Sequence, residues 1–181
     1  MRKTIISIGA LACVLCLTSI GGAQAKPTAT TTAVVQVGGG YSYARPDYGQ
    51  RSIQGISAFA DYDIGLHYGV EADFHYLALY TPQDLAENTF LIGPRVILPR
   101  GRYKFYAKAM FGVGDLVIQN QQNNIGREAG SNFAYAVGGG VEMHATRHIV
   151  IRAIDFEYQH WNYLTGLTPL VLTTGVAYRF H

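Results

Sequence analysis

The stretch Leu170–Phe180 reads LVLTTGVAYRF, and it alternates larger side chains with small or polar ones. One face of an extended chain would carry Leu172, Thr174, Val176, Tyr178 and Phe180. The other face would carry Thr173, Gly175, Ala177 and Arg179. Because successive side chains of a β-strand point to opposite faces, this alternation predicts a strand with one apolar face.

The same alternation recurs upstream in segments of about ten residues, the length of a tilted membrane-spanning strand. These segments are Ala33–Ala44, Ile53–Tyr62, Tyr68–Leu79, Thr89–Leu98, Tyr103–Val113, Asn132–Met143 and Ile149–Gln159. With Leu170–Phe180 the number is even, as in bacterial single-chain barrels. The sequence therefore predicts an all-β fold, an eight-stranded antiparallel up-and-down transmembrane β-barrel.

The connections between these segments alternate in length. The predicted short turns are 63–67, 99–102 and 144–148, and the longer loops are 45–52, 80–88, 114–131 and 160–169. Membrane barrels have short periplasmic turns and longer outer loops, so the alternation also predicts which end faces the cell surface.

The segment Ile149–Gln159 departs from strict alternation, because Ile149 and Ile151 have one parity while Ile154 and Phe156 have the other. One extra residue near Ala153 would restore a common face, and a β-bulge inserts such a residue. The alternative is that Arg152 points outward at the membrane edge.

Alternation alone does not distinguish a membrane barrel from a soluble one, such as a lipocalin. The polar face here is mostly Gly, Ala, Ser and Thr with few charges, whereas a solvated surface is about a quarter charged. Aromatic residues gather near both ends of the apolar face, as at the two interfaces of a membrane. They are Tyr41, Tyr43, Tyr76, Tyr80, Tyr62, Tyr103, Tyr178 and Phe180. Both features favour the membrane.

Residues 1–25 have the pattern of a cleavable signal peptide: basic Arg2 and Lys3, an apolar run, and Ala23-Gln24-Ala25. Alternatives are an anchor helix, for which the run is short, and a lipoprotein signal at Cys13 or Cys16. Residues 26–181 would form the barrel domain, without cysteine and with formal charge near zero. We therefore expect no nucleic-acid partner, no cofactor and no metal.

Charged residues on the polar faces would point into the barrel, where an unpaired charge is costly and a mutually bonded set is tolerable. The predicted lumen network is Glu71, Asp73, Arg95, Lys108, Glu142, Arg152, Asp155 and Glu157, with Asp61, His75, Lys104 and Arg179 on the same faces. The prediction is a plug of ion pairs; the alternative is a narrow gated porin or a proton path.

These features resemble the small outer-membrane β-barrel superfamily, similar to the OmpA transmembrane domain and OmpX. The resemblance implies that Leu172, Val176, Tyr178 and Phe180 form a C-terminal signal read by the barrel-assembly machinery. It departs from the family in having His181 after the terminal aromatic residue. The implied partners are this machinery and outer-membrane lipid.

Some small barrels of this kind are lipid A-modifying enzymes, and the deacylase carries a His-x-Ser pair on one strand face. The sequences after His75, His144, His148 and His160 supply no such serine. We therefore expect no catalytic residues and a non-enzymatic role in envelope structure or in surface-loop interactions. In a loop-binding barrel, Trp161 and Tyr163 are candidate anchors, or equally belt residues.

Overall fold

The computed structural model describes residues 33–47, 52–79, 84–119, 131–162 and 168–180. These residues form strands and no helix. The strands are β1 (Val34–Arg45), β2 (Ile53–Asp63), β3 (Tyr68–Leu79), β4 (Asp84–Arg100), β5 (Tyr103–Gln119), β6 (Asn132–His144), β7 (Ile149–Trp161) and β8 (Leu170–Phe180). The predicted all-β fold with eight strands is confirmed.

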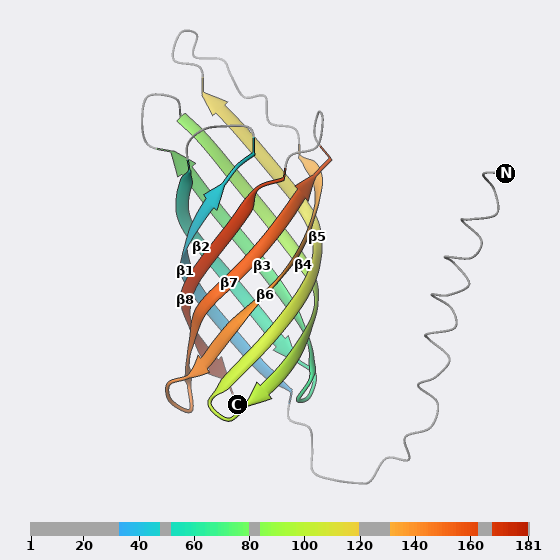
Figure 1. Cartoon of the computed structure of the whole chain (residues 1–181), viewed down its shortest axis with the longest axis vertical. Coiled ribbons are helices and arrows are strands. Elements are labelled where there is room, and N and C mark those ends of the chain that lie inside the picture. The colour runs from blue at the N-terminus through green and yellow to red at the C-terminus, as the bar shows by residue number, and fades with distance from the viewer. Residues whose placement is uncertain (1–32, 48–51, 80–83, 120–130, 163–167, 181) are drawn as a thin grey trace, which may run out of the picture. The chain divides into compact units, whose positions relative to one another are not determined.

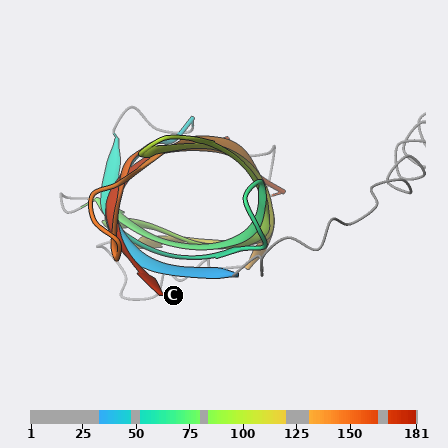
Figure 2. The same cartoon turned by 90° about the horizontal axis from the view of Figure 1, so that it is seen from below.

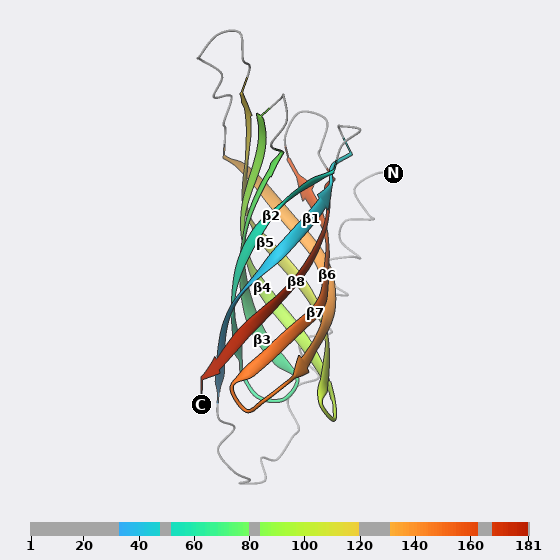
Figure 3. The same ribbon diagram turned by 90° about the vertical axis from the view of Figure 1, so that its left-hand side faces the viewer.

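The strands pair in chain order, each antiparallel to its neighbours, and β1 also pairs with β8 to close the sheet. Figure 2 looks along this barrel and shows the strands as a continuous ring. In Figure 3, β1 and β8 run side by side at the seam where the first and last strands meet. Closure leaves no free strand edge in the barrel.

Two loop predictions are wrong at their margins, because β4 and β5 are longer than the sequence indicated. Residues 84–88 and 114–119 belong to these strands and pair with each other, from Asp84 opposite Gln119 to Asn88 opposite Asp115. Both strands extend beyond the others at the loop end of the barrel (Figure 1). Their extensions read DLAEN and GDLVIQ and do not alternate apolar with polar residues, so the alternation ends before the hydrogen bonding between the strands does.

The predicted bulge in β7 is confirmed. Arg152 pairs with Gly175 and Asp155 with Thr173, so Ala153 and Ile154 together oppose Thr174. On the other side, the register between β6 and β7 shifts between Val141 and Glu142. The extra residue lets Arg152 and Asp155 both point inward, where each is at most 2% exposed.

The barrel is apolar outside and charged inside, the reverse of a water-soluble protein. Outward side chains such as Ile56, Phe111 and Val176 are 65%, 54% and 54% exposed, whereas Glu71 and Arg95 are at most 1% exposed. Among the described residues, no helix has the length and apolarity needed to cross a membrane.

The inward face is less polar than the sequence indicated, because several large apolar residues share it. Ala44, Ile53, Leu77 and Val171 form one buried cluster near the loop ends of β1, β2, β3 and β8. A second cluster contains Leu91, Met110, Ala134, Ala136 and Trp161. A third contains Phe59, Val150 and Ala177. The first two clusters fill the interior on the loop side of its charges, whereas Val150 and Ala177 of the third lie near the turn ends of β7 and β8.

The predicted signal peptide, residues 1–25, lies outside the described residues.

The turn between β4 and β5 is tight, and Gly101 adopts a φ of 63°, which favours glycine. Gly38 is needed for another reason: a Cβ there would lie 2.5 Å from the Phe59 ring.

Candidate functional site: the charged interior of the barrel

The predicted network residues all point inward, and the structure brings them within ion-pair distance. They come from neighbouring strands: Glu71 and Asp73 from β3, Arg95 from β4, Lys108 from β5, Glu142 from β6, and Arg152, Asp155 and Glu157 from β7. Each is 5% exposed or less. The alternating register of the strands is therefore what gathers these charges.

Arg95 binds carboxylates on both sides of its strand. Its Nη1 lies 2.8 Å from Glu71 Oε2 and 2.7 Å from Asp61 Oδ1, and its Nη2 lies 3.1 Å from Glu142 Oε2. The planar guanidinium also lies over the Tyr106 ring, 4.4 Å from the centroid. A planar guanidinium with several N–H donors can bind several carboxylates and still lie over an aromatic ring.

Lys108 lies among four carboxylates. Its Nζ is 2.8 Å from Glu71, 2.6 Å from Asp73, and 2.7 Å from both Asp155 and Glu157. An ammonium group has three protons, so four acceptors saturate it. Lys108 therefore joins β3 to β7 across the interior.

Arg152 connects the remaining acids. Its Nη1 donates to Glu71 Oε1 at 2.9 Å and to Asp155 Oδ2 at 3.1 Å. Its Nη2 donates to Glu142 Oε1 at 3.0 Å and to Asp61 Oδ2 at 3.1 Å. Glu71 consequently binds all three buried cations and is the centre of the network.

The interior holds more acids than bases. Among the described residues, the buried carboxyl groups are Asp61, Asp63, Glu71, Asp73, Glu87, Glu142, Asp155 and Glu157. The buried lysines and arginines are Arg95, Lys108 and Arg152. Lys104 adds a part-buried ion pair, 2.7 Å from Asp63 Oδ2. Carboxyl groups therefore outnumber cationic groups in the described part of the interior.

Two of these acids were not among the predicted lumen residues. Asp63 was expected in a turn and Glu87 in a loop, but both belong to strands and are 3% and 1% exposed. The sequence could not place their side chains on the inward face, because it did not indicate that the strands extend to these positions. Arg179, predicted to face the lumen, is half-buried at the turn end, 3.3 Å from His144 Nδ1.

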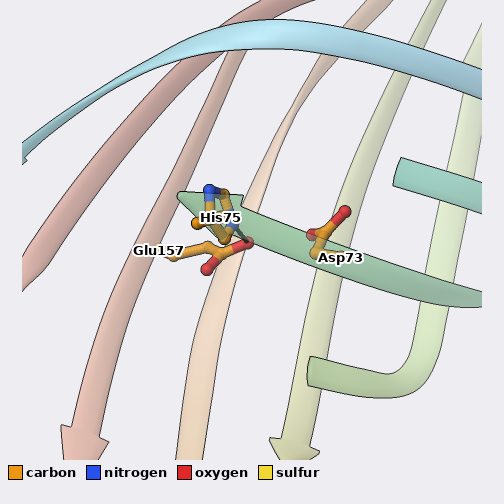
Figure 4. A group of neighbouring side chains, drawn as sticks. All are labelled: Asp73, His75 and Glu157. Carbon is orange, nitrogen blue, oxygen red and sulfur yellow. Dashed lines mark ion pairs between the residues drawn. The ribbon is translucent and has the colours of Figure 1, made fainter. Parts of the chain in front are cut away.

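Asp73, His75 and Glu157 are a group that could hold a metal ion, since one ligand atom from each lies within 4.8 Å of the others. Figure 4 shows the His75 ring beside Glu157, with Nε2 3.5 Å from Oε1, and Asp73 further along β3. Lys108 Nζ, however, already contacts both carboxylates. A metal would share these oxygens with an ammonium group, which opposes its binding.

The structure also brings together a serine, a histidine and an acid that the sequence did not connect. Ser42 Oγ lies 3.2 Å from His75 Nδ1, and His75 Nε2 faces Glu157. Ser42 is separated from His75 by 33 positions, so no local motif could reveal the pair. These residue types can activate a nucleophile. All three are at most 2% exposed, which withholds them from a substrate.

The predicted assembly-signal residues lie on the outer face of β8. Leu172, Val176, Tyr178 and Phe180 are between 40% and 54% exposed, and Tyr178 packs edge-on against Phe180. This placement agrees with the register used in the prediction. His181 lies outside the described residues.

The interpretation of Trp161 as a surface anchor or belt residue is wrong. Its side chain is 1% exposed and packs inside the barrel with Leu91 and Met110. Its indole Nε1 donates to Gln159 Oε1 at 3.1 Å, and Gln159 Nε2 donates to Glu157. Tyr163 lies outside the described residues.

Solved structures with the same fold include the following three proteins. Ail, the attachment invasion locus protein of Yersinia pestis, is 18% identical, with a TM-score of 0.61 over 82% of this chain and 99% of that chain. Neisserial surface protein A (NspA) is 16% identical, with a TM-score of 0.61 over 82% of this chain and 97% of that chain. OprG from Pseudomonas aeruginosa is 12% identical, with a TM-score of 0.54 over 83% of this chain and 97% of that chain.

No curated protein sequence matches the chain. The family model described as "Outer membrane protein beta-barrel domain" matches residues 11–180, nearly the whole length. The outer face of the barrel agrees with this description, because it is a band of apolar and aromatic side chains suited to lipid. The chain therefore belongs to the outer membrane protein beta-barrel domain family, and its location is the cell outer membrane.

Proposed function

We propose that this protein is a non-enzymatic, non-conducting barrel whose plugged interior makes it a rigid scaffold in the outer membrane. The observation that carries the proposal is that Arg95, Lys108 and Arg152 each bind at least three carboxylates contributed by other strands. The surrounding apolar clusters fill the loop side of the same interior.

The width of the barrel and the cost of separating buried ion pairs both favour a plugged interior over an open pore. Eight strands enclose a space only wide enough for side chains to fill. Leaving one buried charge without its partner costs about 3–5 kcal/mol, so an opening that separates several pairs is strongly disfavoured. Because Glu71 binds three cations, no single pair can part without disturbing its neighbours.

The test is conductance of the purified full chain in a planar lipid bilayer, with heat-modifiable gel mobility as the check that the barrel is folded. We expect no conductance steps from the folded protein. A narrow gated porin would instead give discrete steps, and the acid excess of the interior would make them cation-selective. Such steps, abolished on heat denaturation, would overturn the proposal.

The enzyme alternative has one specific observation behind it, the Ser42–His75–Glu157 arrangement. Its test is the acylation pattern of lipid A, measured by mass spectrometry in cells expressing the wild-type protein or Ser42→Ala. We expect the two patterns to equal that of cells without the protein. A change that appears with wild type and disappears with Ser42→Ala would identify an enzyme.

The scaffold would present its outer connections to surface partners, and the segments between the strands at that end are 46–52, 80–83, 120–131 and 162–169. Thr168 Oγ1 donates to Asp47 Oδ2 at 2.7 Å, so the first and last of these connections are joined. Asp47 is exposed. Partial burial raises the pKa of its carboxyl group, but the hydrogen bonds, chiefly from Thr168, outweigh this effect, and the pKa is lowered overall. A surface partner remains a prediction.

A further inference from the structure

Three arginines at the turn end of the barrel project into solvent. Arg100 and Arg102 flank Gly101 in the turn between β4 and β5, and Arg147 lies in the turn between β6 and β7. All three are exposed. We call Arg100, Arg102 and Arg147 the basic rim.

The two turns that carry the basic rim are neighbours. The backbone N–H of His144 donates to the carbonyl oxygen of Arg102 at 2.9 Å, and Tyr103 pairs with Met143. The rim is therefore one continuous stretch of the barrel end formed by adjacent hairpins.

The positive charge of the rim is not neutralised by the part of the chain that the structure describes. No ion pair there involves Arg100, Arg102 or Arg147. Two acids in the described strands lie close to these turns, and both are buried and paired: Asp63 is 3% exposed and bound to Lys104, and Glu142 is 1% exposed and bound to Arg95 and Arg152. The rim is therefore available to an external anion.

Aromatic residues place the rim at the level of lipid headgroups. Tyr103 directly follows Arg102 and is 49% exposed on the outer face. His148 directly follows Arg147 and stacks on Tyr178, with ring centroids 5.5 Å apart. Tyrosines on the outer face of membrane barrels lie at the membrane–water interface, so arginines one residue further lie among the headgroups.

We propose that the basic rim binds the phosphates of anionic phospholipids in the periplasmic leaflet of the outer membrane. The short turns of membrane barrels face the periplasm, which assigns the rim to that leaflet. Guanidinium groups match phosphate oxygens with two parallel hydrogen bonds. The rim would thus hold a phosphatidylglycerol-like lipid against the barrel and fix its depth in the membrane.

The test uses the full chain folded into vesicles of phosphatidylethanolamine and phosphatidylglycerol in equal amounts, then released with mild detergent. Native mass spectrometry measures the ratio of the two lipids retained. Wild type should retain phosphatidylglycerol in excess. Each exposed arginine is expected to contribute about a fivefold preference, from roughly 1 kcal/mol per basic residue near an anionic surface. Arg100→Gln with Arg102→Gln and Arg147→Gln should abolish the excess.

Two controls separate lipid binding from a general effect of charge or folding. The triple lysine variant, Arg100→Lys with Arg102→Lys and Arg147→Lys, should keep most of the excess. Arg45→Gln, which removes an exposed arginine at the loop end of β1, should match wild type. Heat-modifiable mobility confirms that each variant is folded. Equal phosphatidylglycerol retention by wild type and the triple glutamine variant would overturn the proposal, as would equal loss in Arg45→Gln.

A salt series on wild type tests the same idea without any substitution. Raising ionic strength from about 0.1 M to about 1 M shortens the screening length from about 10 Å to about 3 Å. The phosphatidylglycerol excess should fall across this range. An excess independent of salt would assign lipid retention to the apolar face and overturn the role of the arginines.

Discussion

The guanidinium of Arg152 lies over the ring of Phe59, with Cζ 3.6 Å from the ring centroid. The Phe59 ring occupies space that Gly38 leaves open on β1. The most heavily bonded cation of the interior is thus held by an aromatic surface as well as by carboxylates. From this position the guanidinium donates to Glu71 and Glu142.

Replacing Phe59 by Leu should therefore destabilise the barrel although Leu is also apolar. The variant loses a desolvated cation–π contact of about 2 kcal/mol and leaves space beneath Arg152. We expect a loss of ~2–4 kcal/mol in the free energy of unfolding, measured by urea titration in lipid vesicles. Phe111→Leu, on the outer face, is the matched control and should lose much less. Equal losses would contradict the contact.

Removing Glu142 tests the ion network directly. Its two oxygens accept from Arg95 at 3.1 Å and from Arg152 at 3.0 Å, so Glu142→Ala leaves two buried guanidinium groups short of an acceptor. We expect a loss of about 3–5 kcal/mol in the free energy of unfolding. Asp47→Ala, at an exposed acid, should change it little. An unchanged unfolding midpoint for Glu142→Ala would count against the network.

Deleting Ala153 should leave the barrel able to assemble, because the deletion removes the bulge and keeps the alternation of β7. Arg152 would still face inward, Ile154 outward and Asp155 inward. Deleting Phe156 instead leaves one residue too few for both Asp155 and Glu157 to face inward, so one acid would face lipid. We expect the heat-modifiable form from the Ala153 deletion, and its loss with accumulation in the periplasm from the Phe156 deletion. Normal assembly of the Phe156 deletion would show that the register of β7 does not control assembly.

The C-terminal strand offers a test of the assembly signal. Phe180 lies on the outer face with Tyr178, so Phe180→Ser should reduce outer-membrane insertion, measured by fractionation and gel mobility. Deleting His181 should leave insertion nearly intact. If the deletion blocks insertion while Phe180→Ser does not, the outward register of the signal has been assigned to the wrong residues.

The one tryptophan of the chain reports on the packing of the interior. A Cβ at Gly114 would lie 2.9 Å from the Trp161 ring, so Gly114→Val should displace the indole. We expect a shift in the emission of the folded protein and easier quenching by acrylamide. Ala109→Val, on the outer face, should leave both unchanged. A wild-type spectrum from Gly114→Val would place the indole elsewhere.

The outer face of the barrel could be predicted almost completely from the sequence, whereas the interior could not. Apart from the bulge in β7, alternation marks the outward residues of the segments predicted from the sequence, because a membrane requires an unbroken apolar surface. The inward face accepts both charges and rings, so Phe59 and Trp161 carry no distinguishing signal. Ser42 and His75 lie in contact because of the register between β1, β2 and β3. The register depends on how strands pair and is not encoded in any single strand.

Strand ends were the other place where the sequence was insufficient. Beyond the membrane the outer face no longer has to be apolar, so the alternation stops while hydrogen bonding continues. This is why Glu87 was assigned to a loop although it lies in β4 with its side chain buried. The charges nearest each end were consequently the ones that pattern alone misplaced.

The seam between β1 and β8 has a kinetic consequence. Its hydrogen bonds join the first strand to the last, from Val35 opposite Phe180 to Arg45 opposite Leu170. Contacts between such distant positions form late, because the entropy of closing the intervening chain must be overcome first. Until then, Arg152 and Asp155 would sit in a half-built sheet open to water. Pairing of β8 with β1 is therefore the step that excludes water from the interior. Folding should become irreversible on the cell's timescale only after this pairing.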